Sequence, residues 1–377
     1  MNRIKSLKVS CNGRLAGLLA ETPDGLAAFE YDDGWLASGF ALSPFSLPLR
    51  SGVFVPRAEP FGGLFGVFAD SLPDGWGRLV VDRMLRRNGA APQSVTELQR
   101  LAIVGAGGMG ALTYEPEAEI SSAQETDDLD ALSAACSELL RSDETSMLDE
   151  LFRLGGSSGG ARPKALMTID GGEWIVKFPA IADNSNVGEE EYLYSLCARE
   201  CGVDMPETRL FPSGICPGYF GVRRFDRVPG GTGRVHMISV SAMLETSHRV
   251  PNLDYSQLMK LTLKLTKDYE QVGKLFRFMC FNVFAHNRDD HSRNFSFLYD
   301  EAVGVWKLSP AYDLTYSYSI GGEHATSVNG NGRDPGMKDV LAVAEFAGLN
   351  VKWARDAAAE IQLVTKRMLG DVMRRHG

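Results

Sequence analysis

The chain has 377 residues, of which 44% are hydrophobic and 23% charged, a composition typical of folded globular proteins that excludes a largely disordered, collagen-like or coiled-coil chain. At about 100–200 residues per domain, this length predicts two or three domains or one large two-lobed unit. The formal net charge is −9, but residues 115–150 contain twelve acidic residues and a single basic one, Arg141. The rest of the chain is therefore slightly positive, and it remains able to bind anions such as phosphates.

Hydropathy and cysteine usage indicate the cellular compartment of the protein. No window of about 18 residues is apolar and uncharged, so no membrane-spanning helix is expected. The first residues, MNRIKSLKVSCNG, lack the apolar core of a signal peptide. The six cysteines are scattered without a C-x-x-C pair, which favours neither a zinc site nor a disulfide framework. We therefore expect a cytoplasmic protein with no membrane association.

The N-terminal part, residues 1–116, is predicted to form a β-rich domain. Short apolar runs over residues 4–68 are separated by Asn-Gly and Asp-Gly turns. Helical spacing then appears from Pro73 to a stop at Gly89, and a second helix is expected over 94–103. Next comes the G-x-G-x-x-G run GAGGMG, which is followed by a strand-like segment instead of a helix, so a glycine-rich turn is favoured over a dinucleotide-binding fingerprint.

The remaining chain divides into three predicted segments: an acidic helical linker over 117–150, a small lobe over 151–227 and a mostly helical lobe over 228–377. The apolar periodicity predicts helices at 126–141, from about Thr145, and at 188–200, 255–267, 271–286 and 350–374. The linker should pack against the segments that flank it.

The first chemical motif is the run LGGSSGGARPK. Four glycines enclose Ser157 and Ser158, and a β-hairpin follows that ends at Lys177. Glycines allow the backbone to approach a ligand and to point N–H groups at it, which suits a phosphate chain. Protein kinases combine such a loop with a strand lysine, whereas a simple flexible turn is the alternative.

The second motif is more specific. The predicted helix 271–286 leads directly into NRDDHSRN, where Asp289 and Asn294 have the spacing of the kinase catalytic loop. That spacing lets the aspartate reach the attacking hydroxyl while the asparagine holds a metal ion on the phosphates. Asp313, beyond a hairpin-like stretch, lies where a kinase has its other magnesium ligand.

Each of these residues also has a purely structural explanation: Asp289 could cap a helix end, Asn294 could sit in a turn, and Asp313 could be an N-cap. Their order and spacing together favour the catalytic interpretation. Other chemistries fit less well, because the histidines near the loop lack zincin spacing and Ser157 and Ser158 are not expected to form the nucleophile elbow of a hydrolase.

These motifs resemble the HipA family of serine/threonine kinase toxins from bacterial type II toxin–antitoxin systems. The resemblance is carried by LSPFSLPLRSG and FGGLFGVFADSLPDGWGR in the N-terminal part, and then by GGSSGGARPKA, WIVKFP, RRFDR, HNRDDHSRNFSFL and LSPAYDLT. It implies an α+β fold of the bilobal protein-kinase-like (HipA-like) type, with a β-rich N-terminal domain and a mostly helical C-terminal lobe.

The resemblance also implies residue roles. Asp289 would be the catalytic base with His291 beside it, and Asn294 and Asp313 would hold Mg²⁺. Ser157 would be autophosphorylated, which adds about −2 charge where phosphates must lie and should expel the loop and silence the enzyme. The ATP contacts would come from these residues: Ser158, Gly159, Gly160, Lys164, Lys177, Arg223, Phe225, Asp226, His291 and Asn294. The family usually has Glu at the position of Arg223, and the lysine-pairing glutamate would be Glu190 or Glu191.

The activity implied is that of an Mg²⁺- and ATP-dependent protein serine/threonine kinase that inhibits growth. Its partners would be a HipB-like helix-turn-helix antitoxin, operator DNA through that antitoxin alone, and a translation-related protein substrate such as an aminoacyl-tRNA synthetase. Two alternatives stay open, namely a catalytically silent corepressor that binds an antitoxin and an enzyme that transfers AMP in place of phosphate.

Overall fold

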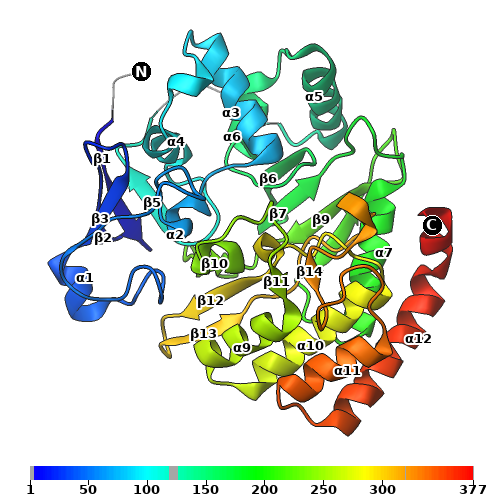
Figure 1. Cartoon of the computed structure of the whole chain (residues 1–377). Coiled ribbons are helices and arrows are strands. Elements are labelled where there is room, and N and C mark those ends of the chain that lie inside the picture. Colours follow the sequence, from blue (N-terminus) through cyan, green and yellow to red (C-terminus); the bar gives the residue numbers. More distant parts are fainter. Residues whose placement is uncertain (1–3, 119–125, 319, 377) are drawn as a thin grey trace. The chain divides into compact units, whose positions relative to one another are not determined.

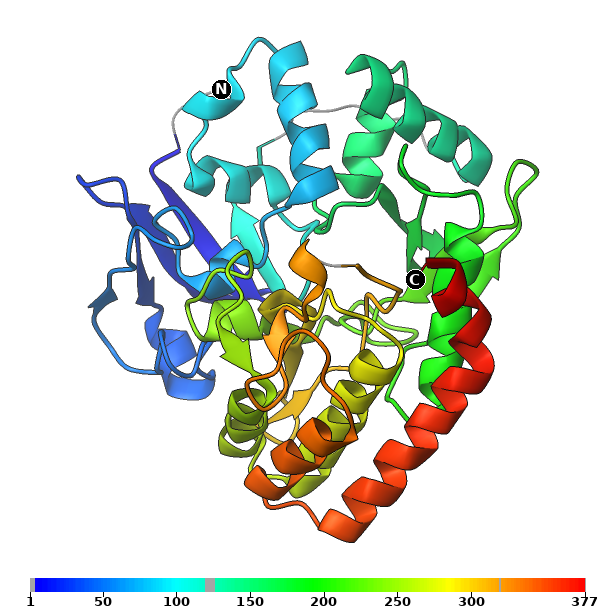
Figure 2. The ribbon, with the colours of Figure 1, turned by 45° about the vertical axis from the view of Figure 1, so that its right-hand side comes forward.

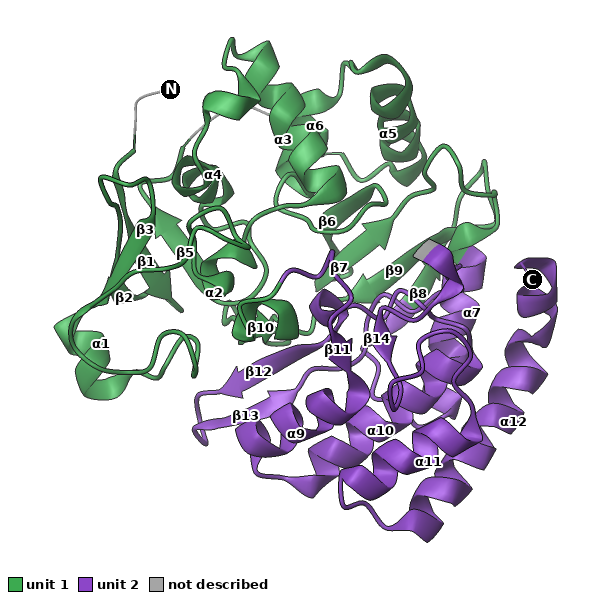
Figure 3. Ribbon diagram, viewed as in Figure 1, with its two compact units in different colours: residues 1–188, 209–246 green, residues 189–208, 247–377 purple. Residues whose placement is uncertain are grey.

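The structure is a computed structural model that describes residues 4–118, 126–318 and 320–376, and it divides into two compact units (Figure 3). Unit 1 comprises Met1–Gly188 and Arg209–Thr246, and unit 2 comprises Glu189–Thr208 and Ser247–Gly377. Each unit is therefore assembled from two separate stretches of the sequence.

Unit 1 begins with an antiparallel five-stranded sheet in the order β4-β3-β2-β1-β5 (Figure 1). Every second side chain of β1 is buried, at Leu7, Val9 and Cys11, as expected of a sheet with one face on the core. The predicted β-rich character of this region is confirmed. The strands are β1 (Ser6–Cys11), β2 (Arg14–Glu21), β3 (Ala27–Tyr31), β4 (Val53–Phe54) and β5 (Leu112–Glu115).

The predicted helices of the N-terminal region are confirmed as α3 and α4. The start of α4 is fixed by a capping box in which the Thr96 hydroxyl accepts from the Gln99 backbone N–H. The GAGGMG run that follows is a turn between α4 and β5, as favoured from the sequence. The helices of unit 1 are α1 (Asp33–Ser38), α2 (Gly66–Ala69), α3 (Gly75–Arg87), η1 (Pro92–Ser94), α4 (Glu97–Val104), α5 (Leu129–Ser142), α6 (Leu148–Gly155) and α8 (Val240–Met243).

The second sheet of unit 1 has the order β6-β7-β9-β8, with β6 (Lys164–Ile169), β7 (Gly172–Lys177), β8 (Thr208–Phe211) and β9 (Tyr219–Arg223); β10 (His236–Ser239) follows later. Helices α5 and α6 of the acidic segment supply apolar side chains to its core. Leu139 of α5 and Leu151 of α6 share one buried cluster with Trp174 of β7. The acidic segment is therefore amphipathic and forms part of the unit, as its predicted packing against the flanking segments requires.

Unit 2 is mostly helical. Helix α10 packs against α9 on one side and α12 on the other, and Figure 2 shows α12 as one long continuous helix. Its elements are α7 (Val187–Glu200), β11 (Leu253–Asp254), α9 (Tyr255–Thr266), α10 (Tyr269–Phe284), η2 (Ser292–Asn294), β12 (Ser296–Asp300), β13 (Val305–Leu308), η3 (Ile320–Gly322), β14 (Thr326–Ser327), α11 (Met337–Phe346) and α12 (Val351–His376). Strands β12 and β13 form the predicted antiparallel hairpin.

None of the helices in the described ranges has the length and apolar character needed to cross a membrane.

A buried histidine of unit 1 makes stability depend on pH. His236 has no exposed surface, and its Nε2 lies 2.8 Å from the carbonyl oxygen of Leu42. Burial lowers the pKa of His236 from 6.5 to about 4, because the charged ring would lose its hydration.

We expect His236 to make the free energy of unfolding fall by roughly 3 kcal/mol between pH 6.5 and 4, because over this range the unfolded chain binds a proton that the folded ring rejects. Urea denaturation of the wild type and His236→Asn across this range measures the effect. The difference in stability between the two proteins should shrink as the pH falls. A difference that does not change with pH would contradict this assignment.

Candidate functional site

The catalytic-loop motif of the sequence forms a compact turn in unit 2. It begins where α10 ends and closes with the short helix η2, whose last residue is Asn294. The Asn294 Nδ2 group donates a hydrogen bond to the backbone carbonyl of Asp289 at 2.7 Å. The five-residue spacing therefore brings the amide side chain back over the first residue of the loop, and the amide oxygen is left as the atom suited to a metal ion.

Asp289 is the exposed carboxylate of this turn, with 58% of its side chain accessible. His291 lies beside it, with Nε2 3.9 Å from the Asp289 Oδ1 atom. Although the side chain is partly accessible, the surrounding protein displaces some of the water around the carboxylate, and this raises the pKa of Asp289. The nearby His291 lowers the pKa, whereas the negative charges of Asp313 and Asp290 raise it further. A carboxylate with a raised pKa is a stronger base than an ordinary aspartate, which suits proton abstraction.

Asp313 is brought to the same turn by the residue before it. The Tyr312 hydroxyl donates to the carbonyl of Arg293 at 2.7 Å and lies 2.6 Å from the Ser296 hydroxyl. Asp313 itself has a left-handed backbone with φ of 58°, a conformation that few non-glycine residues adopt and that is concentrated at functional sites. The structure thus gathers Asp289, Asn294 and Asp313 around one turn.

A buried carboxylate that the sequence analysis did not single out holds this turn in place. Asp290 has 1% exposure and accepts hydrogen bonds from the Tyr255 hydroxyl at 2.8 Å and from the Thr326 backbone N–H at 3.2 Å. The ring nitrogen Nδ1 of His324 lies 2.9 Å from it, and the Thr326 hydroxyl donates to the Asp290 carbonyl at 2.6 Å. Asp290 therefore joins the loop to α9 and to β14.

The same network continues into α10. The amide of Asn282 donates to the Tyr255 hydroxyl at 2.9 Å, and the amide of Asn287 donates to Asn282 at 2.9 Å. Asn282 and Asn287 are both buried. Asn282, a polar residue in the mostly apolar second half of α10, was the signal that could have revealed this network, because buried amides require partners.

The glycine-rich loop lies in unit 1, directly after α6. The Ser158 hydroxyl turns inward and donates to the Gly155 carbonyl at 2.6 Å, whereas the Ser157 hydroxyl donates to the carbonyl of Gly107 at 2.8 Å. Gly107 belongs to the GAGGMG turn, so this turn supports the loop. Gly160, with φ of +90°, donates its N–H to the Asp74 carboxylate.

Two lysines lie directly opposite each other in the strands after this loop. Lys164 of β6 and Lys177 of β7 are cross-strand partners, and each has only 9% exposure. The Lys177 Nζ atom lies 5.6 Å from the centre of the Phe220 ring. Like charges at directly opposite positions of a sheet repel each other, and lysine ammonium groups are of the kind that bind phosphates.

Asp226, one of the predicted nucleotide residues, contacts the GAGGMG turn. Asp226 has no exposed surface, accepts from the Gly110 N–H at 2.7 Å and forms ion pairs with Arg224 and Arg227 at 2.7 and 2.6 Å. Asp226 thus holds two turns of unit 1 together. The predicted contacts of Arg223, Phe225 and Asp226 with the nucleotide stay predictions.

The two candidates for the lysine-pairing glutamate differ in their surroundings on α7. Glu190 is bound by α12, with its carboxylate 3.2 Å from Arg375 and 2.9 Å from the Nε2 atom of His376. Glu191, the next residue, has 2% exposure. Both residues stay candidates, and only the folded chain shows that the Glu190 carboxylate is bound by two residues of α12.

Comparisons with known proteins agree on the family. Residues 7–115 match the family described as HipA N-terminal domain. Residues 156–371, more than half of the chain, match the family described as HipA-like C-terminal domain. The chain belongs to the HipA family. The resemblance inferred from the motifs is confirmed.

Relatives of known sequence and structure cover almost all of this HipA-family chain. It is 27% identical to the protein named "Putative kinase Y4dM" of Sinorhizobium fredii, over 96% of this chain and 90% of the relative, and 28% identical to "Putative kinase Y4mE" of the same organism, over 82% and 77%. A Shewanella oneidensis structure of HipA with HipB and its operator DNA superposes with a TM-score of 0.72 at 17% identity, over 97% of this chain and 90% of that one. The predicted α+β HipA-like fold is confirmed.

The donor atoms around Asn294 and Asp313 fit a magnesium ion. Mg²⁺ prefers hard oxygen ligands and is often bound by one or two carboxylates together with the phosphates of a substrate. An amide oxygen and a carboxylate meet that description. In the described part of the chain no three acidic, histidine or cysteine side chains gather as a metal cage.

We expect Asp290→Ala to lower the free energy of unfolding by about 3 kcal/mol, because it leaves the Tyr255 hydroxyl and the His324 ring buried without their acceptor. The adjacent substitution Asp289→Ala is the matched control, and it should change stability by less than about 0.5 kcal/mol because the Asp289 side chain is exposed. Chemical denaturation of both variants decides this. Equal stability losses for the two variants would contradict the anchoring role of Asp290.

Proposed function

We propose that this protein is a protein serine/threonine kinase that uses ATP and Mg²⁺ and acts as the toxin of a HipA/HipB-type toxin–antitoxin system. The observation that carries the proposal is the turn in which the Asn294 amide binds the Asp289 carbonyl while Asp313 lies near enough for its charge to raise the pKa of Asp289. Family membership and the kinase names of the Sinorhizobium relatives support the same activity.

In the proposed reaction, a serine or threonine hydroxyl attacks the γ-phosphorus of ATP. A bond forms from the hydroxyl oxygen to phosphorus, the bond from phosphorus to the ADP oxygen breaks, and Asp289 accepts the hydroxyl proton. Lys164 and Lys177 balance the negative charge of the phosphates. Asn294 and Asp313 would hold Mg²⁺, which supplies charge neutralisation on the phosphates when it is bound. Phosphoryl transfer depends mainly on such positioning and charge balance.

Ser157 is the proposed site of self-inactivation. Its hydroxyl donates to the Gly107 carbonyl, and a phosphate of about −2 charge on that oxygen would remove the donated hydrogen and repel the carbonyl. The loop would then leave the position in which it can cover a nucleotide.

The proposed partner is a small HipB-like antitoxin, supported by the Shewanella complex of HipA, HipB and operator DNA. Contact with operator DNA is proposed only through that antitoxin. An aminoacyl-tRNA synthetase is the substrate class to test first, on the family resemblance alone.

We expect the purified protein, after phosphatase treatment, to incorporate label from γ-labelled ATP in the presence of Mg²⁺ and to carry it on Ser157. Asp289→Asn should lower the rate about 10²- to 10⁴-fold, because the hydroxyl proton then has no acceptor. Asp371→Asn, an 86% exposed aspartate of α12, is the control and should behave as the wild type.

Mass spectrometry locates the label, and the form of ATP that delivers it separates the alternatives. Label from α-labelled but not γ-labelled ATP would replace the kinase by an AMP transferase. No label from either form, on protein of unmodified mass that still binds an antitoxin, would favour a corepressor without catalytic activity.

A further inference from the structure

The last turn of α12 reaches two elements that the proposed reaction needs. The Nε2 atom of His376 lies 2.9 Å from the Glu190 carboxylate of α7, and Arg375 pairs with the same carboxylate at 3.2 Å. The Glu190 side chain is only 10% exposed. A carboxylate this buried requires compensation of its charge, and these two residues provide it.

The face of the His376 ring packs against the segment that follows Asp313. The ring of Tyr316 stacks on His376, with centroids 5.0 Å apart and planes at 19°, and the Tyr318 hydroxyl donates to the His376 carbonyl. Tyr316 stacks in turn on His286, with centroids 6.2 Å apart and planes at 13°. A series of interactions thus runs from Glu190 through His376 and Tyr316 to His286, the residue that precedes the NRDDHSRN motif.

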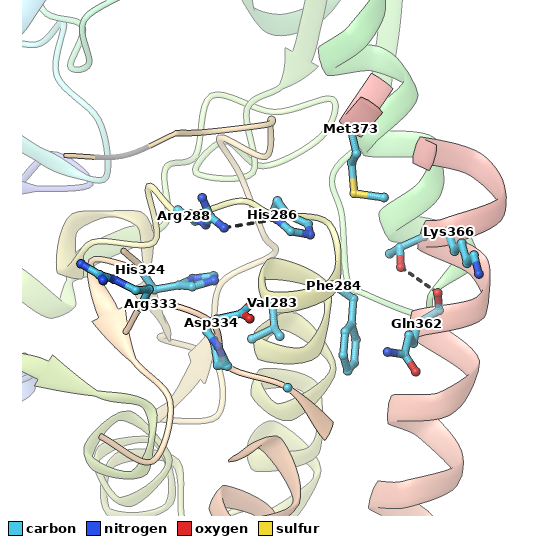
Figure 4. A pocket seen from close by; sticks show the side chains of 13 residues that line it. Val283, Phe284, His286, Arg288, His324, Arg333, Asp334, Gln362, Lys366 and Met373 are labelled. Carbon is cyan, nitrogen blue, oxygen red and sulfur yellow. Dashed lines mark hydrogen bonds between the residues drawn. The ribbon is translucent and has the colours of Figure 1, made fainter. Parts of the chain in front are cut away.

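The catalytic loop itself is tied to both ends of this series. The Ser317 N–H donates to the His286 carbonyl at 3.1 Å, and the Tyr194 hydroxyl of α7 donates to the carbonyl of Ala285 at 2.8 Å. Figure 4 shows Met373, one turn before the end of α12, over the pocket of about 260 Å³ that His286 and Arg288 also line. The end of α12 is therefore close to the loop as well as to α7.

We propose that Arg375 and His376 are positioning residues for phosphoryl transfer, which together with Glu190 and Tyr316 form a C-terminal clamp. The clamp fixes α7, and with it the neighbouring Glu191, against the segment that carries Asp313. This inference rests on the proposed kinase function, because it assigns the clamp to that reaction. A displacement of about 1 Å in a reacting group can cost 10²-fold in rate, so a clamp remote from the chemistry has a measurable effect.

The test is the double variant Arg375→Ala with His376→Ala in the full chain, with Arg374→Ala as the matched control. Arg374 is the preceding residue of the same helix turn, 76% exposed, and its ion pair is with Asp371 of its own helix. We expect the double variant to lower kcat by 10-fold or more with little change in Tm, and Arg374→Ala to keep the wild-type kcat.

Two further measurements distinguish positioning from a general structural effect. Glu190→Gln should give the same loss of kcat, and adding it to the double variant should cost little more, because all three changes remove the same contact. Exchanging the charges, with Glu190→Arg and Arg375→Glu in one chain, should restore part of the activity.

Amide hydrogen exchange provides a readout that does not need kinase activity. Exchange of the segment 313–318 and of the first turns of α7 should become faster in the double variant and stay unchanged in Arg374→Ala. Wild-type kcat in the double variant, or unchanged exchange at both segments, would overturn the clamp. Faster exchange in a protein whose wild type shows no phosphoryl transfer would instead show that the clamp exists and that the proposed function fails.

Discussion

The arrangement of the catalytic loop depends on one buried charge. Asp290 is almost completely inaccessible, and a carboxylate in that position is tolerated only when donors surround it. Tyr255, His324 and Thr326 supply those donors from two other elements of unit 2. Because successive side chains of an extended turn point in different directions, an inward Asp290 leaves the adjacent Asp289 facing out. The exposed base is thus a consequence of the buried anchor.

In unit 1 the constraint comes from two buried positive charges. Lys164 and Lys177 are paired across two strands in a largely buried position. The two like charges repel each other, and a local cost of this kind is found at functional sites. The neighbouring turns are held by Asp74 and Asp226, whose bonds go to backbone N–H groups of Gly160 and Gly110. These carboxylates therefore fix the loops.

Local spacing in the sequence predicted much of the structure. The interval from Asp289 to Asn294 implied a returning turn, and the Asn294 amide does bind the Asp289 carbonyl. The helices α3, α7, α9, α10 and α12 begin and end within a few residues of their predicted limits, because apolar periodicity and glycine or aspartate boundaries depend on neighbouring residues alone.

Contacts between residues far apart in the sequence could not be predicted in the same way. Asp290 is adjacent to the predicted base, but its partners are far from it in the sequence. Tyr255 lies 35 positions before Asp290, and His324 lies 34 positions after it. Glu190 and His376 are separated by 186 positions, so only the folded chain shows that this glutamate is already paired. The role of the GAGGMG turn as a support for Ser157 likewise depends on packing within unit 1.

In the proposed function, Asn294 and Asp313 hold a metal ion on a nucleotide triphosphate beside Asp289. The most direct measurement is a crystal structure of the wild-type chain with Mn²⁺ and a non-hydrolysable ATP analogue, in which anomalous scattering locates the metal. We expect a manganese peak bound by the Asn294 amide oxygen and the Asp313 carboxylate, with the γ-phosphate facing Asp289. A fully occupied nucleotide whose metal lies away from both residues would contradict it.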